Sequence, residues 1–247
     1  ISDIHANLEA LEAVLADLEK QKCAKIYCLG DIIGYGPSPR EVADIVQAVS
    51  AETVKGNHED LVIRRAPKNV HESALAAAEW TRKKLIPGGP GAPERKRERW
   101  EWLKALPLNE DLGEILLAHG MPADSFAYVL GVGDALKVFQ KQMGGARMCF
   151  IGHTHVPGLW FFDGKQLGFG PAEEKRRYGL QDRKVLVNVG SVGQPRDHDP
   201  RACYVVLHGD GSFEYRRVEY DCEKTARRIY GIPDLPNWLG ERLLCGE

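Results

Sequence analysis

Five short blocks of this chain carry side chains that can bind divalent metal ions. In chain order they are Asp3-Ile4-His5, Gly30-Asp31, Gly56-Asn57-His58-Glu59, His119 and Gly152-His153-Thr154-His155. Imidazole nitrogens with carboxylate or amide oxygens, in the absence of thiolates, suit Mn, Fe, Zn, Ni or Co. A single His is usually structural, so the order and spacing of the blocks carry the argument.

The number of candidate ligands indicates the chemistry. Seven ligands are too many for one tetrahedral site, but they suit two metal ions that share a bridging carboxylate, about 3.5–4 Å apart. Such a pair generates hydroxide near neutral pH and holds both oxygens of an in-line displacement at phosphorus. Its positive charge also neutralises the phosphate in the transition state. The blocks therefore predict metal-assisted phosphoester hydrolysis.

Alternating helices and strands position the first three blocks. Apolar residues recur at helical spacing from Leu8 to Leu18, with Asn7 as a candidate cap, and a buried strand at 25–29 ends at Gly30-Asp31. A capping-box pattern at 38–41 starts a second helix, and a brief strand at 53–55 precedes Gly56. The two intervals between these blocks are equally long, and each fits one crossover unit. Ligands at the ends of successive parallel strands emerge at the same edge of a sheet.

The remaining pattern places the other ligands and sets the fold class. Helices are predicted at about 59–65, 72–85 and 95–106, and strands at 114–118 and 148–151 lead to His119 and His153. The chain then becomes rich in strands, with a hairpin signal at Asp163-Gly164. We expect an α/β protein with one domain, 1–247, and two packed sheets with helices on both outer faces. Residues 87–99, which include a Pro- and Gly-rich stretch, are a candidate mobile loop insertion.

Composition narrows the class of protein and its partners. The 247 residues are 43% apolar and 28% charged, with a net charge of −2, which gives no electrostatic case for binding nucleic acid. No apolar run approaches the roughly 20 residues of a membrane helix. Six scattered cysteines are expected to be reduced thiols, which favours a cytoplasmic location. Because Asp3 is almost the first residue, we expect upstream residues in the native protein. The sequence leaves homo-oligomerisation open.

At these blocks the chain resembles the calcineurin-like metallophosphoesterases. Their pattern is Asp-x-His, Gly-Asp, Gly-Asn-His-Glu/Asp, His and Gly-His-x-His, and all five blocks match over about residues 2–155. The segment 188–197 resembles the closing segment of the bacterial and archaeal phosphodiesterase-like branch. The resemblance implies a four-layer αββα sandwich of two mixed sheets flanked by helices. It also implies a phosphodiester or phosphomonoester substrate that is a small molecule.

The resemblance implies a role for each matching position. One metal would be bound by Asp3, His5 and His155, the other by Asn57, His119 and His153, and Asp31 would bridge the two. Hydroxide held by the metals would attack phosphorus. His58 would bind no metal, but would protonate the leaving oxygen or stabilise charge there.

The sequence leaves two alternative functions to consider, and it does not identify the residues that bind the substrate. The protein-phosphatase branch has an Asp that orients the catalytic His and an Arg that grips phosphate, where this chain has Gly34 and Tyr35. A Ser/Thr protein phosphatase-like enzyme is therefore disfavoured, and the residue that orients His58 is unidentified. A catalytically silent protein-binding scaffold is the other alternative. Because the planar fork of arginine can bind two phosphate oxygens, the candidate substrate-binding residues are Arg40, Arg64, Arg65 and Arg196.

Overall fold

The computed structural model describes residues 1–64, 72–88 and 91–247. Its helices are α1 (Leu8–Lys20), α2 (Pro39–Val49), α3 (Asn57–Arg64), α4 (Glu72–Leu85), α5 (Glu94–Ala105), α6 (Val132–Lys137) with the π-helical turn η1 (Val138–Gln142), α7 (Cys222–Tyr230) and α8 (Trp238–Cys245). Its strands are β1 (Tyr27–Cys28), β2 (Glu52–Thr53), β3 (Asn109–Asp111), β4 (Ile115–Ala118), β5 (Met148–Ile151), β6 (Gly158–Phe162), β7 (Leu167–Pro171), β8 (Arg177–Tyr178), β9 (Lys184–Asn188), β10 (Ala202–Leu207) and β11 (Phe213–Val218).

One layer is a mixed sheet in the order β3-β4-β5-β9-β6-β7. Strands β4, β5 and β9 are parallel, whereas β3, β6 and β7 add antiparallel edges. Successive residues alternate between its two faces, as the pleat of a strand requires. Leu117 and Phe150 pack on the inner face, and Leu116 and Cys149 pack on the outer face. The hairpin predicted at Asp163-Gly164 connects β6 and β7.

The second layer is assembled from shorter pieces. β1 pairs in parallel with β2, and β10, β11 and β8 form an antiparallel sheet. The chain at 1–3 lies between β1 and the segment 191–193, because the amide of Leu29 donates to Ile1 O at 2.9 Å and the amide of Val192 donates to Ser2 O at 3.0 Å. That segment is bound in turn to β10, whose Cys203 amide donates to Ser191 O at 2.8 Å. The first metal-binding block is thereby tied on both sides by backbone hydrogen bonds.

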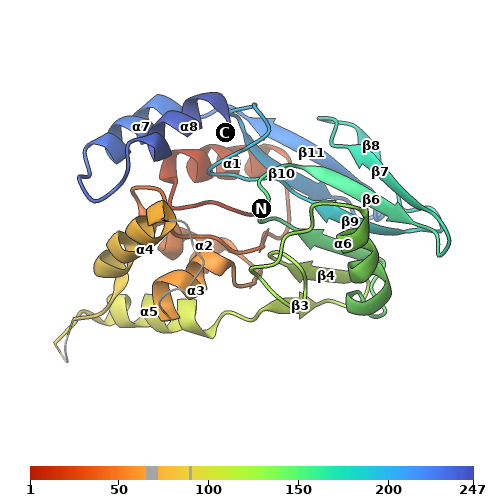
Figure 1. The fold of residues 1–247 in the computed structure, drawn as a ribbon, viewed down its shortest axis with the longest axis horizontal. Helices are drawn as coiled ribbons and strands as arrows, with labels where there is room; N and C mark the ends of the chain where they lie inside the picture. Colours follow the sequence, from red (N-terminus) through yellow and green to blue (C-terminus); the bar gives the residue numbers. More distant parts are fainter. Residues whose placement is uncertain (65–71, 89–90) are drawn as a thin grey trace.

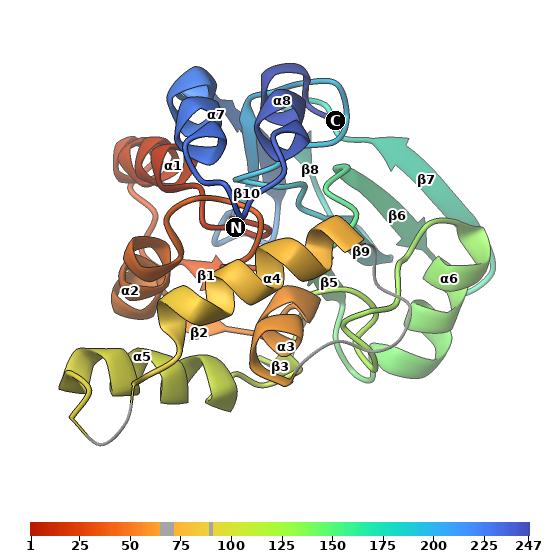
Figure 2. The same ribbon diagram turned by 60° about the vertical axis from the view of Figure 1, so that its left-hand side comes forward.

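Hydrophobic clusters show how the layers stack. Leu117 and Val187 of the six-stranded sheet share one buried cluster with Leu29, Phe213 and Tyr215 of the second layer. Helices α1 and α2 cover the outer face of the second layer, and α6 with η1 covers the outer face of the six-stranded sheet. These helices lie on opposite sides of the strands (Figures 1 and 2). The predicted αββα sandwich is confirmed.

Local signals were read correctly at α1 and only in part at α2. The side chain of Asn7 accepts from the amide of Ala10 at 3.1 Å and caps α1 as predicted. Pro39 begins α2, but Ser38 forms no capping hydrogen bond, so the capping-box prediction was wrong. The amide of Ser38 is bound to Ala6 O at 3.0 Å, and its ψ of 51° lies outside the extended region that N-cap residues adopt.

The predicted loop insertion at 87–99 needs a correction. From Glu94 onward the chain is helix α5, so residues 94–99 are not part of a loop. Arg99 fixes this helix through two hydrogen bonds to Asp44, at 2.5 and 2.7 Å, and Trp100 and Leu103 are buried. The helix predicted at 95–106 is therefore confirmed, and the Pro- and Gly-rich signal ends at Pro93, before α5 begins.

Two further sequence predictions concern thiols and membranes. All six cysteines are free, and Cys28, Cys149 and Cys203 are buried, as expected for reduced thiols. In the described part of the chain, no helix has both the length and the apolar character needed to cross a bilayer.

Candidate metal centre

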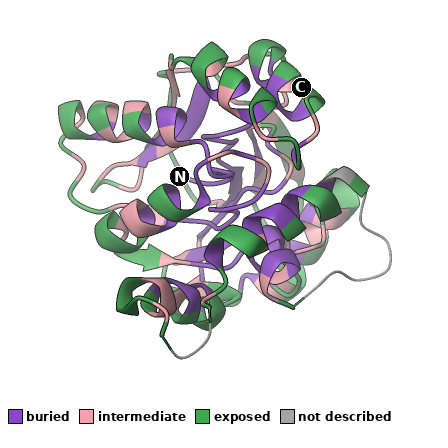
Figure 3. Ribbon diagram, turned by 90° about the vertical axis from the view of Figure 1, so that its left-hand side faces the viewer, coloured by how far each residue is buried: buried purple, intermediate pink, exposed green. Residues whose placement is uncertain are grey.

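The predicted ligands lie close together because they follow the ends of strands in both layers. Asp31 and Asn57 follow the parallel strands β1 and β2, and His119 and His153 follow the parallel neighbours β4 and β5. Because parallel neighbours end at the same edge of a sheet, each layer presents two ligands at that edge. The two edges meet beside the N-terminal segment, among buried segments near the middle of the molecule (Figure 3).

The donor atoms form two groups that share Asp31. In one group, Asp3, His5, Asp31 and His155 place their ligand atoms within 4.8 Å of one another, and Asp31, His119 and His153 do the same in the other. Asp31 Oδ2 lies 3.6 Å from His5 Nε2 and 3.3 Å from His119 Nε2. Asn57 Oδ1 lies 3.0 Å from the same His119 nitrogen. The structure therefore brings together all seven residues predicted as ligands.

Burial and mutual charge set the electrostatics of the cluster. Burial acts to raise the pKa of the Asp3 and Asp31 carboxyl groups, but the neighbouring imidazoles outweigh it and lower both pKa values. His119 shows the reverse balance, because burial lowers its pKa but Asp31 and Asp3 raise it to about 9. Burial lowers the pKa of His153 to about 3. The cluster holds anionic carboxylates in a site shielded from water.

Backbone carbonyls fix which imidazole nitrogen faces the cluster. The Nδ1 atoms of His5, His119 and His155 lie 3.3, 2.9 and 2.5 Å from the carbonyl oxygens of Ile33, Leu29 and Gln194. A carbonyl only accepts, so each Nδ1 carries a proton. Burial lowers the pKa values of His5 and His155, so these two rings are neutral and each turns a lone pair on Nε2 inward. The Nε2 atoms of His5 and His155 face each other at 3.1 Å. Lone pairs aimed at each other and at carboxylates fit a bound cation.

The backbone of the same residues is strained. Asp3, His5, Asp31, His153 and His155 all have positive φ, between 48° and 69°. L-residues rarely adopt this left-handed region, and a strained position persists only where its surroundings over-determine it. Such strain gathers at functional sites, which agrees with the convergence of ligand atoms.

Comparison with known proteins identifies the family to which this arrangement belongs. The family model of the calcineurin-like phosphoesterase superfamily domain matches residues 1–212. The chain belongs to the calcineurin-like phosphoesterase superfamily. It is 35% identical to an uncharacterised protein of Methanocaldococcus jannaschii, over 100% of this chain and 97% of that protein. Members of this superfamily bind divalent metals, and the clustered donors supply candidate ligands for them.

Two solved structures show the same fold. A metallophosphoesterase from Sphaerobacter thermophilus matches with a TM-score of 0.83 and 31% identity, covering 100% of this chain and 97% of that one. A hypothetical protein from Pyrococcus horikoshii matches with a TM-score of 0.75 and 20% identity over the same shares. The resemblance inferred from the five sequence blocks is therefore confirmed.

Glu59 supports the centre of this calcineurin-like phosphoesterase, a role that sequence reasoning missed. Its carboxylate accepts four backbone N–H groups, from Asp31, Ile32, Ile33 and Gly56, at 2.8–3.2 Å. Burial and the nearby Asp31 raise the pKa of Glu59 to about 7, against the lowering effect of these hydrogen bonds. The only sequence signal was its place after Asn57 and His58.

Replacing Glu59 by Ala should destabilise the fold. It would leave four buried donors without a partner, and we expect a loss of about 3 kcal/mol or more in the free energy of unfolding. Urea denaturation monitored by circular dichroism measures it. The matched control Glu79→Ala, on the exposed side of α4, should change the free energy by about 0.5 kcal/mol at most. Equal effects of the two substitutions would contradict the role given to Glu59.

His58 lies against the cluster with an unpartnered ring nitrogen. Its backbone amide donates to Asp31 Oδ1 at 2.8 Å, and its ring contacts Tyr35, with centroids 4.3 Å apart. Nδ1 is buried with no hydrogen-bond partner, and burial lowers the pKa of His58 to about 4. A Cβ atom on Gly34 would lie 2.3 Å from this Nδ1. Ring packing against Tyr35, rather than a carboxylate, therefore positions His58.

The structure separates the four arginine candidates. Arg196 lies at the centre, where its charge lowers the pKa values of His58 and His155 alongside the larger effect of burial. Arg40 is exposed and donates to Lys84 O, and the side chain of Arg64 is 69% exposed and paired with Asp60. Arg65 lies outside the described residues. Among the three candidates that the structure describes, Arg196 alone lies beside the cluster.

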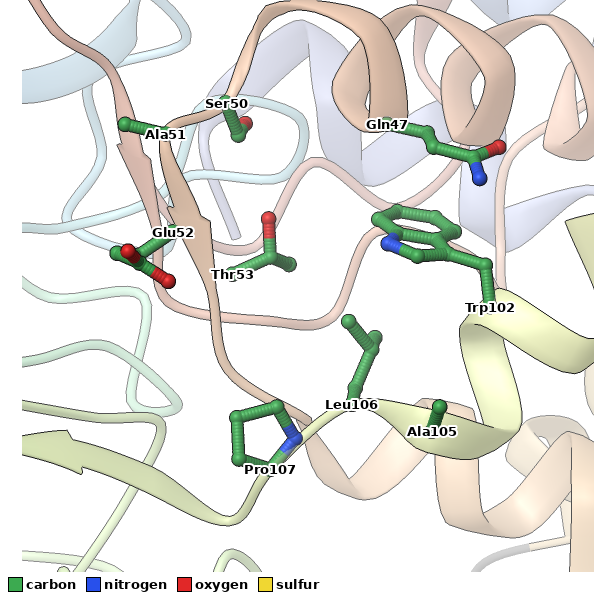
Figure 4. Close-up of a pocket in the computed structure, with 9 residues that line it drawn as sticks. All are labelled: Gln47, Ser50, Ala51, Glu52, Thr53, Trp102, Ala105, Leu106 and Pro107. Carbon is green, nitrogen blue, oxygen red and sulfur yellow. The ribbon is translucent and has the colours of Figure 1, made fainter.

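A separate cavity of about 220 Å³ has no part in this centre. It lies between the end of α2, β2 and the end of α5, and Figure 4 shows its lining, which includes Thr53, Trp102 and Leu106. None of the clustered donors contributes to it. Its Glu52 is the one ionisable residue in the lining, so it offers no catalytic pair.

Proposed function

We propose that this protein is a phosphoesterase that uses two divalent metal ions to hydrolyse a small phosphodiester or phosphomonoester. The observation that carries the proposal is the position of Asp31, whose carboxylate belongs to both groups of donor atoms. Membership of the calcineurin-like phosphoesterase superfamily supports the reaction class. The candidate metals remain Mn, Fe, Zn, Ni or Co, because imidazole and oxygen ligands suit all of them.

In this proposal the two donor groups hold one ion each. Asp3, His5 and His155 would hold the first, Asn57, His119 and His153 the second, and Asp31 would contact both. When bound, the two ions would supply a nucleophile at neutral pH and neutralise charge on the phosphate. The backbone carbonyls behind the imidazoles keep each ring in the tautomer that can bind a cation.

The substrate side of the centre is formed by His58 and Arg196. The Nδ1 of His58 is buried against Gly34, so Nε2 is the ring nitrogen that would contact the leaving oxygen, as a proton donor or as a hydrogen-bond donor. Arg196 would bind non-bridging phosphate oxygens through its planar fork. His58 is neutral at pH 7 in the free protein, because burial lowers its pKa to about 4. A phosphate anion beside it would favour the protonated ring.

The alternatives gain no support from the geometry. In the protein-phosphatase pattern an Asp stands where this chain has Gly34, and here the His58 ring fills the space that such a side chain would need. A silent scaffold does not require convergent donors, yet all seven predicted ligands are present together. A cytoplasmic location, a small phosphorylated substrate without nucleic acid or membrane partners, and the single-domain organisation remain parts of the proposal.

Hydrolysis of two model substrates tests the proposed function. Protein loaded with Mn²⁺ should hydrolyse bis-p-nitrophenyl phosphate, p-nitrophenyl phosphate or both, and chelation followed by Mn²⁺ addition should abolish and restore the activity. Release of p-nitrophenolate measured by absorbance gives the rate. Metal-loaded, folded protein that turns over neither ester would instead favour the scaffold.

A further inference from the structure

Two arginines converge on one neutral oxygen beside the metal centre. Arg196 Nη2 donates to Gln194 Oε1 at 2.8 Å, and Arg242 Nη1, from helix α8, donates to the same oxygen at 3.2 Å. A neutral amide oxygen offsets little of the repulsion between two guanidinium charges. The arrangement therefore concentrates positive charge at one point of the protein.

No side-chain carboxylate of the described residues forms an ion pair with either arginine, although the charge of Glu247 acts on Arg242 from a greater distance. Arg242 Nε donates to the main-chain oxygen of Glu247. The Nε of Arg196 is buried and has no hydrogen-bond acceptor. Burial, reinforced by Arg196, lowers the pKa of Arg242 to about 10. Half-buried cations with a spare, buried N–H donor are costly unless an anion completes the site.

The pair lies directly against the ligands of the proposed first metal. Gln194 O accepts from His155 Nδ1 at 2.5 Å, and the amide of Arg196 donates to His155 O at 3.2 Å. A small cavity lined by His5, Tyr35 and Gln194 continues toward helices α7 and α8. The charges of Arg196 and Arg242 both act on Tyr35, where they oppose the effect of burial on its pKa, and the centroid of the Tyr35 ring lies 4.8 Å from that of the His5 ring. Both arginines therefore lie on the side of the centre that His5 and His155 form.

We propose that Arg196 and Arg242 form a subsite for a second phosphate group of the substrate. This inference rests on the proposed function and narrows it to compounds that carry two neighbouring phosphate groups. Arg242 lies on α8, beyond residues 1–212, where the family model matches. The protein would then bind compounds with two phosphate groups more tightly than compounds with one, because a single phosphate leaves the Arg242 charge without an anionic partner.

Binding of two non-hydrolysable compounds tests the subsite. Methylphosphonate and methylenediphosphonate differ by one phosphonate group, and calorimetry in excess Mn²⁺ measures the Kd of each. The wild-type protein should bind the diphosphonate at least about tenfold more tightly. Arg242→Gln should reduce this preference by about tenfold, because it removes a charge-assisted bidentate contact. The matched control Arg227→Gln, on α7 with a side chain 63% exposed, should keep the preference.

Gln194→Glu provides a second test that does not remove a cation. A carboxylate of nearly the same shape between the two guanidiniums would satisfy them internally, so the diphosphonate preference should fall while thermal stability is kept or raised. An unchanged preference in folded Arg242→Gln and Gln194→Glu proteins would overturn the subsite. The two proposals can fail separately. If the protein hydrolyses neither p-nitrophenyl ester, but prefers the diphosphonate and both variants lose that preference, the phosphoesterase proposal is refuted and the subsite is not.

Discussion

Asp31→Asn is expected to reduce kcat for p-nitrophenyl ester hydrolysis by about 10³-fold or more. Asp31 is the one residue shared by both donor groups, and its Oδ2 faces His119 Nε2 at 3.3 Å. Asparagine keeps the shape and can still accept the amide proton of His58, but it removes the negative charge between the two groups. Steady-state kinetics and elemental analysis of the same preparation measure both consequences.

A matched control separates the loss of this carboxylate from a general effect of the substitution. Asp163, in the β6–β7 hairpin, accepts backbone N–H groups and is exposed. Asp163→Asn should leave activity and metal content near the wild-type values. Full metal content with full activity in Asp31→Asn would contradict the bridging role.

His58→Ala is expected to lower kcat by about 10²–10⁴-fold while the metal content stays constant. His58 belongs to neither donor group, and its Nδ1 has no partner within the described protein. Its contribution should depend on the leaving group. Because p-nitrophenolate needs little help to depart, an alkyl phosphate should suffer a larger loss than a p-nitrophenyl phosphate.

The comparison of leaving groups decides between the roles left open for His58. A loss that grows as the leaving group becomes more basic identifies a proton donor, and an equal loss for all esters identifies a contact with the phosphate. His208→Ala, at a half-buried position on the surface after β10, serves as the control and should retain activity. Depletion of metal in His58→Ala would refute the assignment of His58 as a residue that binds no metal.

The convergence of the ligands could be predicted, because it follows from the spacing of the blocks and from the alternation of helices and strands between them. Equal intervals from His5 to Gly30 and from Asp31 to Gly56 fit crossover units, and parallel strands end at one edge. The αββα layers followed from the resemblance and agreed with the alternation of helices and strands. Asn7 capped α1 as expected, because an N-cap depends on residues only three positions apart.

Features that depend on distant contacts could not be read from the chain. Glu59 gathers amides from 26 to 28 positions away as well as that of Gly56. Arg242 and Gln194 are 48 positions apart in the sequence, and no local motif indicates that their side chains are in contact. The helix at 95–106 was predicted from local pattern, but the Arg99–Asp44 ion pair that fixes it spans 55 positions and could not be predicted.

The central claim is that the Asp31 carboxylate contacts two cations at once. Anomalous diffraction from crystals of the Mn²⁺-loaded protein, collected near the manganese absorption edge, tests it directly. The account predicts two peaks about 3.5–4 Å apart, one among Asp3, His5 and His155 and one among Asn57, His119 and His153, with Asp31 between them. A single peak, or two peaks of which only one lies within bonding distance of Asp31, would contradict it.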